Sequence, residues 1–401
     1  MDIKALKRRY AIAFRALYHR IKTILNIDKH QSYYHLGTMA LELGNWSASA
    51  QYLQQASALD PTYFRANYLL GLVLSKLQRW QEAVDALEKA VALRPADYAS
   101  LELLAQALIK ALEVNANNVH VDANNVHVDE VVIKQKALVN KMIGSTHPKY
   151  VLNSALAPSY PHFLIVGQQK CGTTSLYSYL IKHPQILPAL KKEIHFWNEN
   201  VDLGEDWYLS HFPAIASGSG YITGEASATY LDTVHIVPKI AKILPDIKII
   251  VLLRNPVDRT ISHYHMRSRD RNESASMQDA VFSGIVARDN DSEIKPMDSG
   301  QDNRYLAGSR YVELLRKWMS VIPREQFLVL RSEDLFMNPM EVVNRTFDFL
   351  GVEPHELSNY RKSNSGSYVP IPGQSRQLLC DYFDVYNQQL EDYLGMTFDW
   401  N

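Results

Sequence analysis

The sequence predicts an α/β domain with a P-loop-like parallel β-sheet flanked by helices, preceded by an all-α helical domain. Three observations support this fold class. From about residue 161, apolar β-rich runs alternate with amphipathic segments, which is typical of a parallel sheet covered on both faces. A glycine-containing turn joins the first of these runs to a helix start. Before residue 115, short motifs recur at a spacing of 34 residues, which indicates stacked helical repeats.

Composition narrows the class of protein. The chain has 401 residues, of which 46% are hydrophobic and 21% charged, as in ordinary globular proteins. The net charge of -1 gives no reason to expect nucleic acid as a partner. Cys171 and Cys380 are the two cysteines, and so few fit a reducing compartment. No apolar run approaches the roughly 20 residues that span a membrane, so we expect a cytoplasmic protein.

Residues 1–30 are predicted to form a basic amphipathic helix. Residues 1–24 contain seven basic residues against one acid, Asp2, and their apolar residues recur at helical spacing. Such a helix either lies on an anionic membrane surface or packs on the next domain with a solvated basic face. The second interpretation is the one we favour.

Residues 31–114 contain the helical repeats. The positions that recur after 34 residues are the pairs Leu36 and Leu70, Gly37 and Gly71, Trp46 and Trp80, Ala56 and Ala90, and Pro61 and Pro95. This period and these residue types resemble tetratricopeptide repeats. The glycine and alanine positions allow helices to approach closely, and the proline ends the second helix. The repeats either offer a concave surface to a protein or peptide, or form a scaffold that caps its neighbour or self-associates.

Residues 115–158 are predicted to be a linker followed by a connecting helix. The segment ANNVHVD occurs twice in tandem, at 116–122 and 123–129. It is rich in asparagine and shows no helical period, so we expect an inserted linker or hairpin. His120 and His127 lack further ligands at tight spacing, and a metal site is therefore not expected there.

The first segment that indicates chemistry is FLIVGQQKCGTTSL, residues 163–176. Gly167 and Gly172 have the spacing of a nucleotide-binding loop, but Thr173 stands where the lysine is expected, and Lys170 lies inside the loop. The N–H groups of a helix start attract an anion. The hydroxyls available there are those of Thr173, Thr174 and Ser175. We expect an anion site rather than an ordinary capped helix.

Two further segments follow predicted strands. Arg254 ends the strand IIVLLR, and Ser262 lies on the helix beyond the turn; together they can grip a second phosphate, although Arg254 alone could equally pair with a carboxylate. In KKEIHFW, residues 191–197, an extended backbone would turn Glu193 and His195 to the same side. This pair is a candidate general base; the alternative is a strand end whose charges face water.

Together these motifs resemble the sulfotransferases that use 3′-phosphoadenosine 5′-phosphosulfate (PAPS). The resemblance covers residues 159–401 and implies the sulfotransferase fold. It implies that the K-x-G-T-T-x-L loop binds the 5′-phosphosulfate and that the R-N-P-x-x-R-x-x-S segment binds the 3′-phosphate. The implied donor-binding residues are Lys170, Cys171, Gly172, Thr173, Thr174, Ser175, Leu176, Arg254 and Ser262. The layout with repeats ahead of this domain is similar to that of bacterial sulfotransferases with tetratricopeptide repeats.

The match is closest to the heparan sulfate N- and O-sulfotransferases. KKEIHFW resembles their K-E-[IV]-x-F-F element, which makes Glu193 the implied catalytic base. Two positions depart from the family pattern. Ala226 replaces a lysine of the cleft, a role that Lys191 could take over. The late loop lacks its usual basic residues, so closure over the donor is expected to use Ser367 and Tyr368.

The predicted function is transfer of a sulfuryl group from PAPS to a hydroxyl or amine, with PAP as product. Glu193 takes the proton, Lys170 stabilises charge on the leaving phosphate, and His195 orients the acceptor or is the alternative base. No metal is expected. The acceptor is expected to be a glycan, with a peptide or small hydroxyl compound as alternatives. Arg267, Arg269 and Arg271 either hold an acidic glycan or belong to a solvated loop.

Two competing functions stay open. A P-loop kinase or NTPase requires G-K-[ST] and a magnesium-binding aspartate, and the sequence has Thr173 and Arg254 at those positions. The other is an interaction protein, in which the repeats bind a partner and the sulfotransferase-like domain is inactive.

Overall fold

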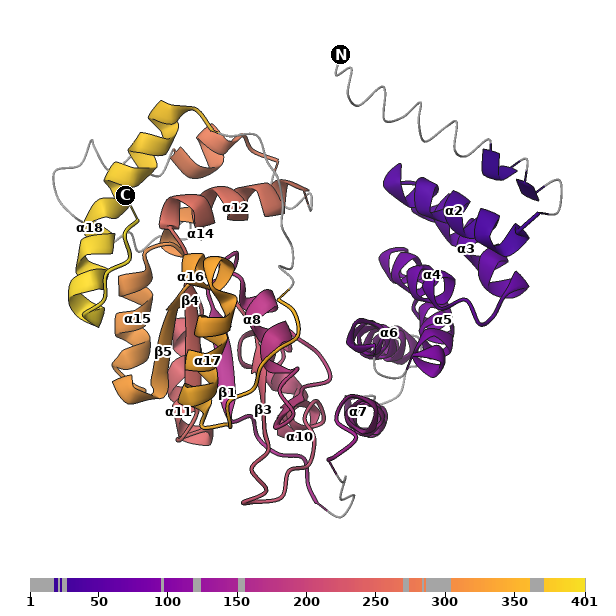
Figure 1. The fold of residues 1–401 in the computed structure, drawn as a ribbon, viewed down its shortest axis with the longest axis horizontal. Coiled ribbons are helices and arrows are strands. Elements are labelled where there is room, and N and C mark those ends of the chain that lie inside the picture. The colour runs from indigo at the N-terminus through magenta and orange to yellow at the C-terminus, as the bar shows by residue number, and fades with distance from the viewer. Residues whose placement is uncertain are drawn as a thin grey trace. The chain divides into compact units, whose positions relative to one another are not determined.

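The computed structural model of the chain describes residues 18–20, 22–23, 27–94, 97–117, 124–150, 156–269, 274–282, 285, 304–360 and 371–400. Most of the predicted N-terminal helix, Arg271, Ser367 and Tyr368 lie outside the described residues. The chain divides into two compact units (Figure 1). The helical unit comprises Met1–Ala155 with Leu209–Pro213, and the α/β unit comprises Leu156–Tyr208 and Ala214–Asn401.

The helical unit is a series of helices, each packed on the next (Figure 1). They are α2 (Lys29–Glu42), α3 (Trp46–Leu59), α4 (Phe64–Lys76), α5 (Trp80–Leu93), α6 (Tyr98–Asn117) and α7 (Asn124–Thr146). The repeated glycines explain the close packing. A Cβ atom added to Gly37 would lie 2.7 Å from Cγ of Leu53, and one added to Gly71 would lie 2.3 Å from Cγ of Leu87. The same glycine–leucine contact therefore recurs in both repeats.

The prediction of a linker or hairpin for the tandem ANNVHVD segment is wrong for its second copy. Helix α7 begins at Asn124 and continues without interruption to Thr146. Asparagine is only moderately unfavourable in a helix, at about 0.7 kcal/mol relative to alanine. Helix propagation is cooperative, so the helix-forming stretch downstream extends back through the asparagines. None of the helices within the described ranges has the length and apolar character needed to cross a membrane.

The α/β unit is built on a five-stranded parallel sheet in the order β2-β3-β1-β4-β5. The strands are β1 (Phe163–Gly167), β2 (Ile186–Pro188), β3 (Ile222–Ala226), β4 (Lys248–Leu253) and β5 (Phe327–Arg331). All five residues of β1 are buried, and Phe163 is opposite Gly224 of β3 and Lys248 of β4. This is the predicted fold, with the near-continuous apolar strands that burial on both faces requires.

Helices flank the sheet and connect its strands (Figure 1). The longer ones are α8 (Thr173–Leu180), α11 (Val237–Ile243), α12 (Pro256–Arg269), α15 (Tyr311–Met319), α16 (Ser332–Met337), α17 (Pro339–Leu350) and α18 (Gly373–Leu394). The short ones are α9 (Phe196–Glu199), η1 (Val201–Leu203), α10 (Glu205–Leu209), η2 (Val234–Ile236), η3 (Gln278–Phe282), α14 (Arg304–Ala307) and η4 (Arg324–Gln326). Trp318 anchors α15 in the core: it is fully buried, and its Nε1 donates to the carbonyl of Leu231 at 3.1 Å.

Strand β5 ends at Arg331, and Ser332 opens α16 directly. Because all strands are parallel, the segments after β1, β2, β3, β4 and β5 emerge at the same edge of the sheet. Ligands of open α/β sheets bind at this carboxyl edge.

Candidate functional site

The loop between β1 and α8 is held through three successive carbonyl groups by side chains from the segments that follow β4 and β5. Nε of Arg259 donates to the carbonyl of Gln169 at 3.3 Å, and Nη1 of Arg254 donates to that of Lys170 at 3.4 Å. The hydroxyl of Ser332 donates to the carbonyl of Cys171. A trans peptide bond directs its N–H away from its C=O. The N–H groups of Lys170 and Gly172 therefore point away from these donors.

Two left-handed residues shape this loop. Lys170 has φ 72° and Gly172 has φ 97°. A Cβ atom on Gly172 would lie 2.9 Å from Cζ of Phe336, so glycine is required both for the backbone conformation and for the space. The chain then enters α8 at Thr173. The predicted combination of a turn, a lysine and a helix start is present at the carboxyl end of the central strand.

Buried side chains support the loop from beneath. Gln168 is fully buried, and its Nε2 donates to Oδ1 of Asp232 at 2.6 Å and to the carbonyl of Gly308 at 2.7 Å. Arg259 is also fully buried, and its Nη1 donates to the carbonyl of Tyr305 at 3.2 Å. The sequence analysis did not identify Gln168 or Arg259 as residues that support the loop. Arg259 is the second arginine of the R-N-P-x-x-R-x-x-S segment, and this position could have indicated it.

Cys171 is buried within the loop, and burial raises the pKa of its thiol to about 11. A thiol with this pKa stays protonated at neutral pH and is a poor nucleophile. Its backbone contributes to the loop, whereas its side chain packs inward.

Arg254 follows β4 directly, as predicted. Besides its bond to the loop, its Nη2 lies 4.0 Å from Oδ2 of Asp258, and its side chain is 26% exposed. Ser262 lies on α12 and is buried, with 4% exposure. The structure therefore joins Lys170 and Arg254 directly, with Ser262 further along the helix that Arg254 precedes.

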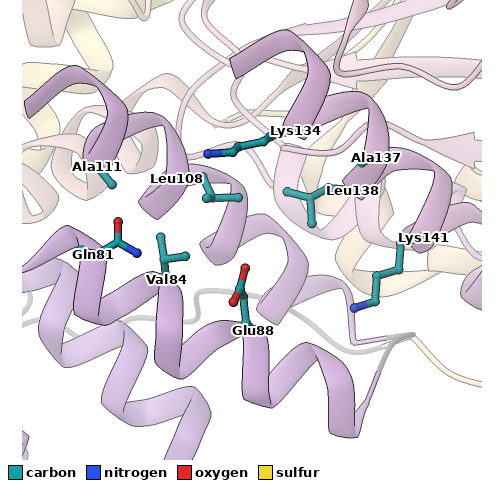
Figure 2. Close-up of a pocket in the computed structure, with 9 residues that line it drawn as sticks. All are labelled: Gln81, Val84, Glu88, Leu108, Ala111, Lys134, Ala137, Leu138 and Lys141. Carbon is teal, nitrogen blue, oxygen red and sulfur yellow. The ribbon is translucent and has the colours of Figure 1, made fainter. Parts of the chain in front are cut away.

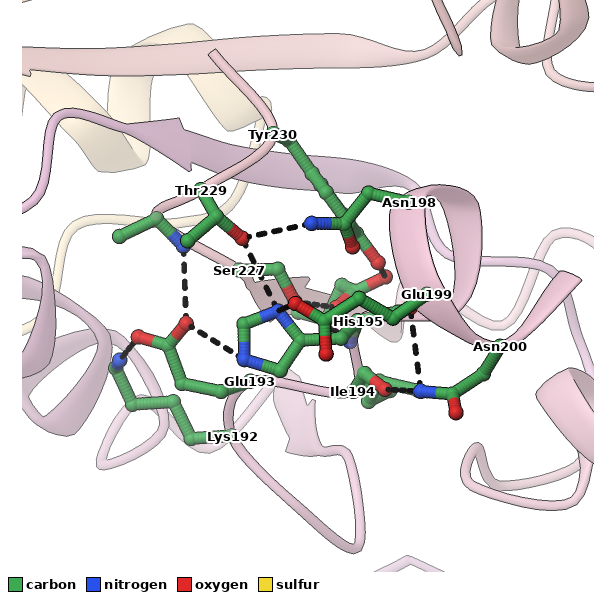
Figure 3. A network of polar contacts seen from close by, with 12 residues as sticks. Lys192, Glu193, Ile194, His195, Asn198, Glu199, Asn200, Ser227, Thr229 and Tyr230 are labelled. Carbon is green, nitrogen blue, oxygen red and sulfur yellow. Dashed lines mark hydrogen bonds and ion pairs between the residues drawn. The ribbon is translucent and has the colours of Figure 1, made fainter. Parts of the chain in front are cut away.

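The neighbouring strands β2 and β3 supply the second part of the site (Figure 3). Glu193 lies in the segment after β2 and His195 begins α9, and their side chains meet: Nε2 of His195 is 3.6 Å from Oε2 of Glu193. The expected extended strand is wrong, however. Both residues have left-handed backbones, with φ 62° and φ 57°. The pair converges because two turns fold it together, not because of strand alternation.

Contacts with the turn after β3 hold Glu193 in place. Its backbone N–H donates to the carbonyl of Ala226 at 3.1 Å, and its Oε2 accepts from the N–H of Ala228 at 3.1 Å. Lys192 forms an ion pair with Oε1 (Figure 3). Lys192 is almost fully buried, so this cation lies beside the carboxylate. The sequence signal for Lys192 was its place next to Glu193 in the K-E element, whereas Lys191 was the residue proposed.

His195 is oriented by polar neighbours. Its Nδ1 lies 3.1 Å from Oγ1 of Thr229 and 3.9 Å from Oε1 of Glu199. Nδ2 of Asn198 also donates to Oγ1 of Thr229 at 3.1 Å (Figure 3). Burial lowers the pKa of His195, against the raising effect of Glu193 and Glu199. The imidazole is therefore mainly neutral at pH 7 and able to accept a proton.

Ala226, the position at which the resemblance implied a lysine, is fully buried at the end of β3. The residue before it, Glu225, is a fully buried carboxyl group, and burial raises its pKa to about 7. Sequence reasoning did not single out Glu225, although its place directly before Ala226 was an available signal.

A cluster of cations surrounds His263 of α12. His263 is 6% exposed, and burial together with Arg259, Arg267, Arg304 and Lys170 lowers its pKa to about 3. These groups come from the loop, from α12 and from α14. The convergence of positive charge with Lys170 favours an anionic ligand at this end of the sheet.

The helical unit has a groove of its own, of about 350 Å3, between α5, α6 and α7 (Figure 2). Apolar side chains form its floor and polar ones flank it. The lining residues are Gln81, Val84, Glu88, Leu108, Ala111, Lys134, Ala137, Leu138 and Lys141. Whether the repeats bind a protein, or only act as a scaffold, stays a prediction.

The fold and the site define an α/β protein with a lysine-containing loop at the carboxyl end of the central strand and a carboxylate–imidazole pair in the segment after β2. Comparison with known families agrees with this class. The sulfotransferase domain family matches residues 160–366, about half of the chain. The chain therefore belongs to the sulfotransferase domain family, as the loop motif predicted. The tetratricopeptide repeat family matches residues 34–98 and 73–112.

Individual relatives agree with this assignment. The bifunctional heparan sulfate N-deacetylase/N-sulfotransferase 2 of Bos taurus is 31% identical over 269 residues, which cover 59% of this chain and 29% of that protein. The membrane-associated sulfotransferase kil1 of Dictyostelium discoideum is 26% identical over 313 residues, or 60% of this chain and 66% of that protein. The chain thus spans less than a third of the first relative and about two thirds of the second.

A solved structure shares the fold. The crystal structure of a sulfotransferase from Alicyclobacillus acidocaldarius is 29% identical, with a TM-score of 0.50. The similarity covers 60% of this chain and 99% of that chain. The α/β unit therefore has the sulfotransferase fold, with the helical repeats as an additional part.

Proposed function

We propose that this protein transfers a sulfuryl group from PAPS to a hydroxyl or amine of a carbohydrate. The observation that carries the proposal is the juxtaposition at one sheet edge. The loop of Lys170 follows β1, and the pair of Glu193 and His195 adjoins β3, which is hydrogen-bonded to β1. A donor phosphate bound by the loop would thus lie next to a carboxylate able to accept a proton.

The residues of the loop fit a phosphosulfate. Lys170 and Arg254 supply positive charge, and the N–H groups of Lys170 and Gly172 are turned away from the side chains that hold the loop. Fixed donors of this kind stabilise charge that develops on a leaving phosphate oxygen. Lys170 lies inside the loop rather than after Gly172. This position suits a ligand that lacks the triphosphate tail of a nucleoside triphosphate.

In the proposed reaction, Glu193 accepts the proton of the acceptor hydroxyl or amine. The acceptor oxygen or nitrogen forms a bond to sulfur as the bond from sulfur to the phosphate oxygen breaks, which leaves PAP and the sulfated acceptor. Lys170 and the loop amides neutralise the charge on the leaving oxygen. His195 orients the acceptor. Such transfers pass through a loose, in-line transition state, so that positioning and charge stabilisation dominate.

A glycan acceptor is supported by the relatives whose names include heparan sulfate. The cations that surround His263 suit an acceptor that is itself acidic. Peptides and small hydroxyl compounds are the alternatives that the experiment must include.

The test is a transfer assay with labelled PAPS against libraries of glycans, peptides and small hydroxyl compounds, with products identified by mass spectrometry. We expect sulfated carbohydrate as the main product. Calorimetry with PAP, ATP and GTP, with and without magnesium, runs in parallel. Tighter binding of magnesium–ATP than of PAP would overturn the proposal in favour of a kinase or NTPase. Binding of PAP without transfer to any acceptor would favour an inactive domain.

A further inference from the structure

Glu225 is a buried acid that the proposed reaction does not use directly. It lies on β3, and its side chain is the common acceptor of three hydroxyl groups. Oε1 accepts from the hydroxyl of Tyr208 at 2.8 Å and from that of Tyr230 at 3.1 Å. Oε2 accepts from the hydroxyl of Ser227 at 2.7 Å. Three hydrogen bonds to one buried carboxylate strongly stabilise one arrangement of the three hydroxyl groups around it.

Each of these hydroxyls also receives an N–H from the start of α9. The N–H of His195 donates to Oγ of Ser227 at 3.2 Å. The N–H and the Nε1–H of Trp197 donate to the hydroxyls of Tyr230 and Tyr208, at 3.5 Å and 3.3 Å. A hydroxyl has only one proton to donate, and here that proton is directed to Glu225. Three hydrogen-bonded chains, called relays below, therefore connect His195 and Trp197 to Glu225: one passes through Ser227, one through Tyr230 and one through Tyr208.

The segment that these relays hold contains the proposed base. Glu193 and His195 both have positive φ, a conformation that costs non-glycine residues of the order of 1 kcal/mol or more and persists only with external support. Glu193 is tied to Ala226 and Ala228, on either side of Ser227. The end of β3 and its turn thus hold both members of the Glu193–His195 pair.

We infer that Glu225 is a positioning residue for sulfuryl transfer: its carboxylate, through Ser227, Tyr208 and Tyr230, fixes the backbone from which Glu193 and His195 reach the acceptor. This inference rests on the proposed function. Within the described residues, the side-chain hydrogen bonds of Glu225 go to Tyr208, Ser227 and Tyr230 rather than to the donor loop. Its influence reaches the reaction only through the residues that it holds.

The protonation of Glu225 must then affect the geometry. A protonated carboxyl group has a hydrogen of its own to donate, so at least one of the three relays would have to reverse or break. The titratable groups that face it are Tyr208 of α10, Tyr230 of the turn after β3, and Glu193 of the segment after β2. Burial, helped by the charge of Glu193, raises the pKa of Glu225 to about 7. The ionised, fully positioned form therefore dominates above pH 7 and is lost below it.

The test is the substitution Glu225→Gln in the full chain, with kcat, KM for the acceptor and the affinity for PAP measured between pH 5.5 and 8.5. We expect kcat to fall about 10- to 100-fold, since small misplacements of catalytic groups have effects of this size. The affinity for PAP should change less than about two-fold, because the loop after β1 is untouched. The decline of kcat below pH 7 that belongs to Glu225 should disappear.

Two milder variants keep the inference falsifiable if Glu225→Gln does not fold. Ser227→Ala removes the relay to His195, and Tyr230→Phe removes one relay to Trp197. Both should lower kcat with PAP affinity retained. The matched control is Tyr160→Phe, which removes a tyrosine–carboxylate hydrogen bond of 2.7 Å to Glu205, a residue outside the hydrogen bonds of Glu225 described above, and should leave kcat unchanged. Normal kcat in folded Glu225→Gln, or in both milder variants, would overturn the inference, as would a loss of PAP affinity equal to the loss of kcat.

A readout independent of turnover separates this inference from the proposed function. In NMR spectra of histidine-labelled protein, the His195 resonances should show an inflection near pH 7 in the wild type, and Glu225→Gln should abolish it. If this inflection is present and no acceptor is sulfated, the proposed function fails while Glu225 still positions His195. If the wild type is active and the inflection is absent or survives Glu225→Gln, the inference fails and the function stands.

Discussion

The donor side and the base side of the site lie at the same sheet edge but are built differently. On the proposed donor side, the groups available for binding are mainly backbone groups of a glycine turn and a helix start, and side chains hold the loop carbonyls. On the base side, side chains act: Glu193 and His195 meet across two left-handed residues, and buried hydroxyls hold them. A site built from backbone groups can therefore be recognised as a short motif in the sequence. A site built from side chains depends on partners that are distant along the chain.

The largest effect on activity is expected on the base side. Glu193→Gln should lower kcat by roughly 100- to 10,000-fold, because removal of a positioned general base typically has this effect. PAP affinity, measured by calorimetry, should be retained. The control is Glu199→Gln, whose carboxylate is 60% exposed and borders the same histidine. Near-normal turnover in Glu193→Gln, together with an inactive His195→Ala, would move the role of base to His195.

The donor side should respond in binding as well as in rate. Lys170→Ala should weaken PAP by about 10- to 100-fold, the range expected for loss of a hydrogen bond to a charged group. Titration calorimetry measures this loss, with Lys239→Ala on the exposed face of α11 as the control. Unchanged PAP affinity would show that the loop does not bind the donor through this lysine, and the contrast between the two sides would then fail.

Gly172→Ala tests whether the donor side depends on backbone shape. An alanine at this left-handed φ of 97° would press on Phe336. We expect it to lower the free energy of unfolding by about 1–3 kcal/mol and to reduce the affinity for PAP. Chemical denaturation followed by fluorescence measures the stability. Gly373→Ala is the matched control, because a Cβ atom there meets nothing within 4 Å and φ is not positive. Equal stability of the two variants would contradict the requirement for glycine.

The smallest effect at neutral pH is expected for His263, which neither side uses as a base. Burial and the surrounding cations lower its pKa to about 3, so the folded protein keeps it neutral while the unfolded chain binds a proton below about pH 6.5. The contribution of neutral His263 to the free energy of unfolding is therefore complete above pH 6.5 and is lost as the pH falls toward 3. His263→Gln should flatten this loss in denaturation measured at pH 4 and pH 7. The exposed His235→Gln should not, and equal acid sensitivity of the two variants would contradict the assignment.

Much of the fold followed from local pattern. The repeats were visible because Gly37 and Gly71 each meet a leucine of the next helix, and a repeated contact leaves a repeated sequence. The strands were visible because burial on both faces demands apolar runs. The second ANNVHVD copy was misjudged because its helix is continued from downstream residues. The pairing of Glu193 with His195 was expected for the wrong reason, since their left-handed backbones have no pattern in the sequence.

The sequence by itself determined the class of this protein and the local shape of its Lys170 loop. Lys170, Gly172 and Thr173 lie within one turn of chain, where the order of residues is also their arrangement in space. Only the tertiary structure decided what surrounds Glu193. Ala226 and Ala228 hold its backbone N–H and its carboxylate because β2 and β3 are hydrogen-bonded neighbours. Parallel strands bring together segments that are far apart along the chain, and the chemistry of a buried carboxyl group is set by those neighbours rather than by its own position.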